Sequence, residues 1–599
     1  MKKMIVKVAI TTGLLFVVSG CGDDTTKKSV ASTSSTKASV AVAPKVSMEE
    51  RKATFDKQIK MLSTVGFDIQ QTENHYTLHI KESKKATAAL LSLINMATLG
   101  PRERTLVEDA IDGAKVGVTV DWSKYAANTE KSVEVYFMGN GQESDLLAKI
   151  IAEKKIGAYL TFDGKDSIKK VTFKDIDEKL TKGVEVAHIM LTGAKIDIKK
   201  TATKTSPSKI FTVQGGKFSY SLENNGSKEM AFSYSNPHCE IDKSNAYLGK
   251  QTCSFPLIQV DGGADSDSLS VTFRDSNMVY ELSAHNKKIK TDILFKIPTI
   301  DIKLKDKSDD VSMQLKNFHI GGNSDNMDES LMKEFYALAQ APMKDINATM
   351  KKSMALVGEL FSQGVTFDYT VGLASLKGTA LNRGKTTEFM MNGYHAKSHA
   401  LMDKTIEGNT KTTIEHISVN EKGSKTALFD LKGFKFGSTI KDLYNFFPEF
   451  MQFAGTLAQK QQYGVAPGKA EEEQMAALGT KVVNNGLSFS LSPLGIDSVA
   501  FDTMGQKMSY GKIDFDLDAT LAKNDIKFDN PMASMMLLSF LQADGKLVLS
   551  KADLDKMSQQ FPPQMIGMVM MFAKYEADKA VFVLKFEKGH LMVNDKPVM

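Results

Sequence analysis

Alternation of apolar and polar residues, the pattern of half-buried strands, recurs along most of this chain. Three alternating stretches each begin at a glycine that follows a helical tract: Gly117–Trp122, Gly364–Tyr369 and Gly486–Leu491. Glycine commonly ends a helix because it adopts a left-handed conformation at little cost, and alternation indicates one buried and one solvated face. The three copies suggest a duplicated helix–hairpin unit, with chance similarity among helix-to-strand transitions as the alternative.

Strand patterns also fill the centre of the chain, between about residues 164 and 323. Turn residues at Asn224–Gly226 and Asp261–Gly263 separate neighbouring strands. Helices do not alternate with these strands, which favours antiparallel pairing over parallel units. The predicted fold is therefore α+β and mostly antiparallel, with long curved β-sheets and amphipathic helices packed on one face.

Helical spacing of apolar residues predicts two long helical tracts within the sheet and a last helical pair. The first tract is Asp328–Gln363, and the second begins at Ser438. Pro448 is expected to kink or split the second tract, because proline cannot donate a backbone hydrogen bond. The last helical pair is expected at Met532–Leu541 and Lys551–Lys574.

The first 21 residues carry an export pattern. Lysines at positions 2, 3 and 7 precede the apolar run Val8–Val18, which is too short to span a membrane. A basic start, a short apolar run and small residues describe a secretory signal. Cys21 directly after Ser19-Gly20 resembles the lipobox of bacterial lipoproteins. That resemblance implies that Cys21 becomes the N-terminus and is diacylated, with palmitate as an expected acyl group; an ordinary signal with a chance cysteine is the alternative.

Residues after Cys21 are rich in Ser, Thr, Ala and Lys without hydrophobic periodicity, which predicts a flexible tether. Enteric lipoproteins that stay in the inner membrane carry Asp directly after the lipidated cysteine, whereas here Asp23 lies one place later. The resemblance therefore favours the periplasmic face of the outer membrane. Order is expected from Ser47, which forms a capping-box pattern with Glu50. The expected regions are a signal peptide (1–20), a tether (21–47), an N-terminal α+β region (48–200), a β-rich region with a disulfide (201–325) and a C-terminal helix-and-sheet region (326–599).

Composition places the chain among globular proteins, with 42% hydrophobic and 25% charged residues. The formal charge of +5 falls when the signal and its three lysines are removed, which leaves 73 basic and 71 acidic residues. That balance does not favour a polyanionic partner. The five arginines are few for phosphate or base recognition, so nucleic-acid binding is not expected.

Cysteine usage fits an exported protein. With Cys21 assigned to lipid, Cys239 and Cys253 remain as an even pair, and an oxidising periplasm favours a disulfide between them. A zinc site would need more ligands than His238 and two thiols.

A resemblance arises at the C-terminus. The alternating strand Ala580–Phe586 is followed by Gly589-His590-Leu591-Met592-Val593-Asn594-Asp595-Lys596-Pro597. This hairpin resembles the end of the YdgA-like family of Gram-negative envelope proteins of unknown function. The chain departs from that pattern at Asp595, where glycine is expected, and in its lipobox. The resemblance implies an envelope location and a β-rich architecture, and it carries no catalytic residues.

Catalytic and metal-binding motifs are absent from the sequence, which contains no Gly-x-Ser-x-Gly, His-Glu-x-x-His, P-loop or dinucleotide fingerprint. The pairs His75/His79 and His395/His399 have zinc-like spacing but no third ligand nearby, so solvated histidines are expected. Gly262–Ser270 resembles one calcium-binding nonapeptide, a repeat that binds only when stacked on neighbours. No metal, cofactor or catalytic residue is therefore predicted.

Methionine is the remaining chemical signal, with 32 in the chain. Thioether side chains are flexible and fill irregular gaps or contact varied apolar ligands. Core packing is the first interpretation and a lipid- or partner-facing groove the second. The candidate residues for apolar ligand contact are Met535, Met536, Met565, Met568 and Met571.

Together these patterns predict a membrane-anchored periplasmic lipoprotein that is a non-enzymatic scaffold or binding module, for lipid or another apolar envelope component. One alternative is a hydrolase of envelope polymers whose carboxylates meet only in the fold. Another is a purely structural protein that contacts other envelope proteins. A continuous hydrophobic channel would favour binding, whereas two close carboxylates with raised pKa values would favour the enzyme.

Overall fold

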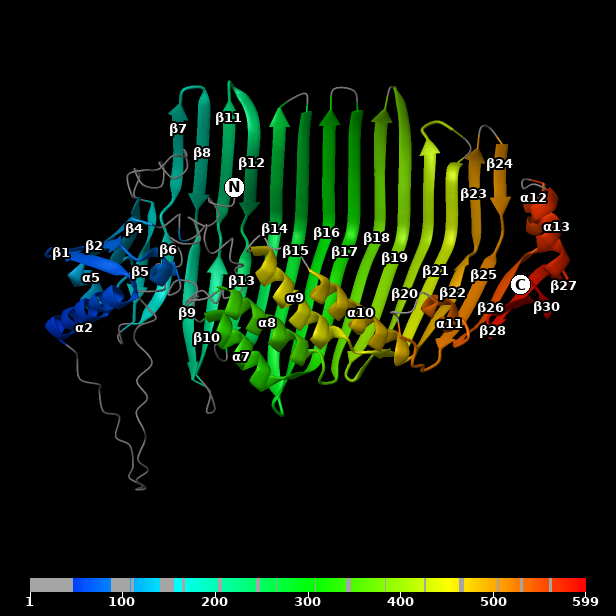
Figure 1. Cartoon of the computed structure of the whole chain (residues 1–599). Coiled ribbons are helices and arrows are strands. Elements are labelled where there is room, and N and C mark those ends of the chain that lie inside the picture. Colours follow the sequence, from blue (N-terminus) through cyan, green and yellow to red (C-terminus); the bar gives the residue numbers. More distant parts are fainter. Residues whose placement is uncertain are drawn as a thin grey trace, which may run out of the picture. The chain divides into compact units, whose positions relative to one another are not determined.

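The computed structural model describes residues 47–87, 108, 112–139, 156–163, 167–202, 207–243, 248–264, 267–306, 309–340, 346–382, 384–424, 427–462, 468–503, 506–527, 532–559 and 563–598. The chain forms two compact units: residues 1–249 with 339–344, and residues 250–338 with 345–599. Both contain mainly antiparallel strands (Figure 1), so the predicted mostly antiparallel class is confirmed. No helix in the described ranges is long and apolar enough to cross a membrane.

The first unit begins with a helix and continues as short strands. Its elements are α2 (Met48–Met61), the 3₁₀-helix η1 (Leu62–Val65), β1 (Phe67–Gln71), β2 (His75–Ile80), β3 (Lys115–Val120), α5 (Trp122–Ala126), β4 (Val133–Gly139), β5 (Gly157–Phe162), β6 (Ile168–Phe173), β7 (Ile176–Lys182), β8 (Glu185–Thr192), β9 (Lys195–Ala202), β10 (Pro207–Gln214), β11 (Lys217–Asn224), β12 (Ser227–Ser235) and β13 (His238–Lys243). One antiparallel ladder runs β1–β2–β3–β4–β5–β6–β9–β10–β13, and another runs β7–β8–β11–β12.

The first unit has a conventional hydrophobic core. Phe55 and Ile59 of α2 are fully buried, as their helical spacing predicts. The ring of Phe55 meets those of Trp122, Tyr125 and Phe162 at centroid distances of 5.5–6.2 Å. The predicted capping box is also present, because the Glu50 N–H donates to the Ser47 hydroxyl and the Ser47 N–H donates to the Glu50 carboxylate.

The second unit contains the long strands. Its elements are β14 (Gly249–Ala264), β15 (Asp267–His285), β16 (Lys288–Asp306), β17 (Asp309–Asp328), α7 (Glu329–Gln340), α8 (Ile346–Leu360), β18 (Val365–Asn382), β19 (Lys385–Met402), β20 (Thr405–Glu421), β21 (Ala427–Tyr444), α9 (Phe447–Gln462), α10 (Lys469–Asn484), β22 (Leu487–Ile496), β23 (Ser498–Thr503), β24 (Gln506–Tyr510), β25 (Ile513–Leu521), α11 (Ala533–Leu537), β26 (Leu541–Ser550), α12 (Lys551–Ser558), α13 (Pro563–Phe572), β27 (Lys574–Glu576), β28 (Lys579–Glu587), β29 (His590–Val593) and β30 (Lys596–Pro597).

Successive hairpins build this sheet. The strands β15 to β21 pair in sequence order, and each pairing is antiparallel. β21 then pairs with β22 along one part of its length and with β23 along another. The ladder continues through β25, β26 and β28 on one branch and through β24 on the other.

A local irregularity crosses the sheet at one level, and we call it the crease. In six consecutive strands, β16 to β21, two large apolar residues there are separated by two residues that are polar, small or proline. These stretches are Ile297–Ile300, Leu315–Phe318, Leu373–Leu376, Met391–Tyr394, Ile414–Ile417 and Leu431–Phe434. The alternation of apolar positions therefore slips by one residue in every strand. The slip lies at the same level throughout because Ile300, Leu315, Leu376, Met391, Ile417 and Leu431 are successive cross-strand partners.

Left-handed backbone conformations accompany the crease in alternate strands. Every second strand has a residue with positive φ at this level: Asp275 in β15 (55°), Asn317 in β17 (53°), Gly393 in β19 (64°) and Gly433 in β21 (63°). A left-handed residue departs from the extended conformation and so interrupts the alternation of side chains. The cross-strand register continues through the crease without a shift. In Figure 1 the long strands change direction near the middle of their length.

Several helix predictions are corrected by the structure. Residues from Ser438 to Tyr444 are strand, not helix, because they complete the β21 ladder with β20. Pro448 neither kinks nor splits a helix, since it is the second residue of α9, where a backbone N–H has no helical partner to lose. The predicted tract 328–363 is divided into α7 and α8. The expected helix 532–541 reduces to α11, with Leu541 already in β26, and the tract 551–574 is divided into α12 and α13.

The three glycine-led strands have different causes. Gly364 and Gly486 have φ values of 74° and 75° and lie directly before β18 and β22, as the helix-stop argument predicts. Gly117 lies inside β3, where a Cβ would come 2.4 Å from the ring of Tyr136. Gly117 is therefore required by close packing and not by a helix end.

Candidate functional site

The long strands carry two unbroken rows of apolar residues between the crease and the hairpin ends. The first row crosses nine strands by direct cross-strand partners, each on the same face as the next. It consists of Phe273, Ile300, Leu315, Leu376, Met391, Ile417, Leu431, Val499 and Tyr510. At about 4.8 Å per strand the first row is roughly 38 Å long.

The second row lies two residues farther from the crease on each strand. It consists of Val271, Ile302, Met313, Gly378, Phe389, Val419, Phe429, Phe501 and Met508. Gly378 is the one member without a side chain, and the Phe389 ring lies over it. We call the two rows together the apolar strip.

Residues between the two rows face the opposite side of the sheet and are mostly polar. On the first three strands they include Thr272, Asp301 and Gln314, and the Gln314 amide donates to the Asp301 carboxylate at 2.8 Å. Farther along, the His416 ring lies 3.2 Å from the Asp430 carboxylate. One face here is thus apolar and the other mostly polar.

The apolar strip has no conventional core above it. The two clusters of fully buried apolar residues in the described part of the chain lie elsewhere, one in the first unit and one around Leu549 and Phe582. Of the strip residues, only Ile300 and Tyr510 are fully buried, and the others are half-buried. Apolar patches of this extent on soluble proteins usually mark a binding surface.

Exposed apolar side chains also occur on the other side of the crease, toward the helices. Tyr280, Ile293, Ile320 and Tyr369 of β15 to β18 are each 39–50% exposed. Beside them, Phe367 stacks on Tyr369, and its ring lies 5.2 Å from that of Phe361, directly after α8. The apolar surface therefore continues beyond the crease until it meets the helices.

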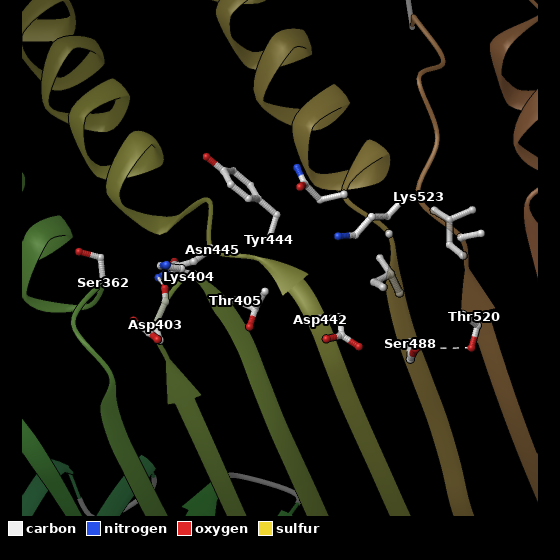
Figure 2. A pocket seen from close by; sticks show the side chains of 15 residues that line it. Ser362, Asp403, Lys404, Thr405, Asp442, Tyr444, Asn445, Ser488, Thr520 and Lys523 are labelled. Carbon is white, nitrogen blue, oxygen red and sulfur yellow. Dashed lines mark hydrogen bonds between the residues drawn. The ribbon is translucent and has the colours of Figure 1, made fainter.

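A separate, polar cavity of about 700 Å³ lies where β21, β22 and β25 meet the connections to the helices (Figure 2). Its lining includes Lys404, Lys523, Asp403 and Asp442, and neither lysine is in an ion pair within the described residues. Asn445 shapes its floor by donating to the carbonyl oxygens of Phe361 and Asp403. These groups suit a small polar ligand, and none of them belongs to the apolar strip.

The residues singled out from the sequence are distributed as follows. Cys239 and Cys253 are disulfide-bonded, as predicted. Cys21 lies outside the described residues, so its acylation stays a prediction. Met535, Met536 and Met571 are 57%, 46% and 58% exposed, and the side chains of Met565 and Met568 lie outside the described part. Apolar ligand contact by these methionines also stays a prediction.

The histidine pairs do not converge on a metal site in the described part of the chain, where no group of three His, Cys, Asp or Glu side chains could hold an ion. His75 lies 3.1 Å from the Thr119 hydroxyl and stacks on Tyr136. His399 lies 2.9 Å from the Asp368 carboxylate. Each has a local polar partner, consistent with a histidine on a solvated strand face.

Carboxyl groups with a resolved pKa shift are all lowered in the described part of the chain. Hydrogen bonding to the Ser123 hydroxyl is the largest cause for Asp121, whose pKa falls to about 2. Salt-bridging to Lys170 and Lys574 lowers the pKa values of Glu130 and Glu576 in the same direction. A general acid of a glycosidase needs the opposite shift.

No family model, curated protein or solved structure matches this chain. The sequence analysis did not predict the apolar strip, although the sequence contains a signal for it. The stretches of the form apolar-x-x-apolar at the crease recur in consecutive strands, and they locate the level at which the two rows begin.

Proposed function

We propose that this protein binds acyl chains of lipids along the apolar strip and is a non-enzymatic binding module. The observation that carries the proposal is the first row, in which nine neighbouring strands of the ladder, β15 to β21, β23 and β24, present apolar partners without an interruption. Covering a half-exposed strip of this length with hydrocarbon would remove a large apolar area from water, at about 25 cal/mol per Å².

The width of the strip suits an extended acyl chain. The two rows are about 7 Å apart, because residues two apart on a strand rise 3.3–3.4 Å each. On the hairpin side the strip is bounded, because the next row changes from Leu304, Val311 and Ala380 to Thr387 and Glu421. On the other side the apolar surface continues across the crease toward the helices. An extended hydrocarbon chain is narrow enough for two rows.

We also propose that the helices cover one face of the long sheet, the face that carries the apolar strip. The contact of Phe361 with Phe367 supports this arrangement, because Phe367 belongs to the apolar set on the helix side of the crease. Figure 1 shows α8, α9 and α10 across the helix-side halves of the strands. The slip at the crease would keep the apolar sets of both halves on that same face, with the hairpin-side half left open.

The location we propose is the periplasmic face of the outer membrane, with Cys21 as the lipid anchor. The lipobox resemblance supports the anchor. The residue directly after Cys21 is Gly22, and the aspartate comes only at Asp23, which supports the outer membrane. The resemblance of the C-terminal hairpin to the YdgA-like family fits this location. A bilayer at the end of the tether would supply acyl chains to the apolar strip.

The two alternatives have less support. For an envelope-polymer hydrolase, the upward pKa shift of a general acid is not among the resolved shifts of the described carboxyl groups, which are downward, as at Asp121, Glu130 and Glu576. A purely structural interaction protein would need a protein partner to cover the strip, whereas a bilayer at the end of the proposed tether would itself supply acyl chains.

Lipid extraction tests the proposed function. The full chain with Cys21→Ser is purified from the periplasm, so that covalently attached lipid does not contribute, and co-purifying lipids are identified by mass spectrometry. We expect bound phospholipid or fatty acid. Met391→Asp should reduce the amount of bound lipid, because a carboxylate in the middle of the first row opposes burial of hydrocarbon beside it. Met390→Asp is the matched control, since Met390 is the neighbouring methionine on the polar face. A lipid-free protein would refute the proposal.

A further inference from the structure

The apolar strip is longer than a single acyl chain. The hydrocarbon core of a bilayer is about 30 Å thick and contains two chains end to end, so one chain spans about 15 Å. The first row, at roughly 38 Å by strand spacing, exceeds two such lengths. A site shaped for one lipid would end where that lipid ends.

Nothing along the strip defines such an end. All the members of the two rows are aliphatic, aromatic, methionine or glycine residues, with the Tyr510 hydroxyl as the only polar group, at the last position. Each row position is followed by a direct apolar partner on the next strand, and the place of Gly378 is taken by the Phe389 ring. A bound chain would therefore meet similar contacts wherever it lay along the rows.

A lipid headgroup could stay in water while its chain lies on the strip. The second row passes through Ile302 and Phe389, each four residues from a hairpin end at Asp306 or Lys385. Four residues of strand span about 13 Å. The hairpin ends carry both signs of charge, including the ion pair of Lys385 with Glu421 at 3.3 Å. This polar margin follows the apolar strip along its hairpin side.

We infer that the apolar strip is a track, on which two or more acyl chains lie in file across the strands and move along the sheet. This inference rests on the proposed function and adds the number of bound chains and their movement. Movement follows from uniformity, because a chain displaced by one strand exchanges one set of apolar contacts for an equivalent set, with no polar group to desolvate.

Photo-crosslinking at the two ends of the strip tests the track. Phe273 in β15 and Phe501 in β23 are replaced, one at a time, by a photoreactive phenylalanine derivative in the full chain. The probe is a vesicle of phosphatidylethanolamine and phosphatidylglycerol with labelled palmitoyl chains, and free labelled palmitate is used in a parallel arm. We expect labelling at both ends and native mass spectra with two or more lipids per chain. Labelling from palmitate alone would identify the free acid as sufficient.

A charged substitution in the middle of the strip distinguishes a continuous track from independent binding sites. Met391 lies on the fifth of the nine strands, so Met391→Asp should lower labelling at one end at least five-fold and leave the other end labelled. Met390→Asp should change neither end. Thermal unfolding of both variants checks that they fold alike. One lipid per chain, or unchanged labelling at both ends behind the barrier, would overturn the track and leave the proposed function standing. No labelling of the unblocked protein would overturn both.

Discussion

The ring of Phe389 occupies the space that a side chain on Gly378 would need: a Cβ there would lie 2.2 Å from Cζ of Phe389. The two residues are direct partners on β18 and β19 and adjacent members of the second row. We predict that Gly378→Ala displaces the ring and destabilises the second unit by about 1–3 kcal/mol, as overpacking does. Urea denaturation measures the change, and lipid retention should fall with it.

A double mutant distinguishes the clash with the Phe389 ring from any other destabilising effect of alanine at position 378. In Gly378→Ala with Phe389→Ala the clash with the ring is removed and the contact with the Ser312 carbonyl oxygen, 2.7 Å from the Cβ position, remains. The two substitutions should therefore be less destabilising together than the sum of each alone. The expected coupling is about 1 kcal/mol or more, within the range for contacting residues. Strict additivity would show that the ring does not constrain Gly378.

The disulfide between Cys239 and Cys253 gives a second prediction. It closes a loop of about 15 residues, for which loop entropy in the unfolded chain corresponds to about 3 kcal/mol. Cys253→Ser should therefore lower the free energy of unfolding by up to that amount under oxidising conditions. Under a thiol reductant the variant and the parent protein should unfold at the same denaturant concentration. Two reduced thiols in native periplasmic protein would contradict the prediction.

The lowered pKa of the Asp553 carboxyl leads us to predict that the stability of the protein depends on pH. Burial alone would raise the pKa of its carboxyl, but hydrogen bonds from the Ser550 hydroxyl, the Gly511 N–H and the Lys556 ammonium together hold the pKa below its ordinary value of 3.8. A lowered folded-state pKa means that the ionised group stabilises the fold above pH 3.8 and loses this effect as the pH falls through the folded-state pKa.

The measurement for Asp553 compares Asp553→Asn with the parent protein by chemical denaturation between pH 2 and pH 7. At pH 7 the variant should be less stable by about 1–3 kcal/mol, the cost of disturbing charged hydrogen bonds at a buried group. The difference should shrink as the pH falls below about 4. A gap independent of pH would mean that packing, and not charge, sets the effect.

Membrane attachment gives a fourth prediction. If Cys21 is diacylated, Cys21→Ser should move the protein from the membrane fraction to the soluble periplasmic fraction, since stable attachment takes more than one acyl chain and both would be lost together. Mass spectrometry of the N-terminal peptide should show the acyl groups on the parent protein. Membrane association unchanged by the substitution, with no lipid mass on the parent, would exclude the anchor.

Strand content and local caps could be predicted from the sequence, because they depend on neighbouring residues. In β2 the alternation of the sequence matches the burial in the structure, since Tyr76, Leu78 and Ile80 are almost fully buried. The error at Ser438–Tyr444 has a non-local cause. Its apolar residues fit helical spacing, but the ladder with β20 determines the outcome, and a partner strand is not visible in a local pattern.

Prediction of the apolar strip requires the register between strands as well as the alternation within each strand. Val419 and Phe429 are near each other in the chain, and a hairpin between them could be guessed from the sequence. Leu315 and Leu376 are separated by two helices, and only the pairing of β17 with β18 places them side by side. Their common position directly beside an apolar-x-x-apolar stretch is the clue that could have aligned the strands.

The left-handed residues of the crease occur in β15, β17, β19 and β21 and so have a period of two strands. One hairpin is therefore the smallest segment that could be inserted or removed while every remaining strand keeps a compatible neighbour. Each added hairpin would lengthen both rows by two positions, or about 10 Å. Duplication of one hairpin, such as Val365–Met402 or Thr405–Tyr444, would thus lengthen the apolar strip by a fixed step. Proteins with the same crease but different lengths are the expected products of that growth.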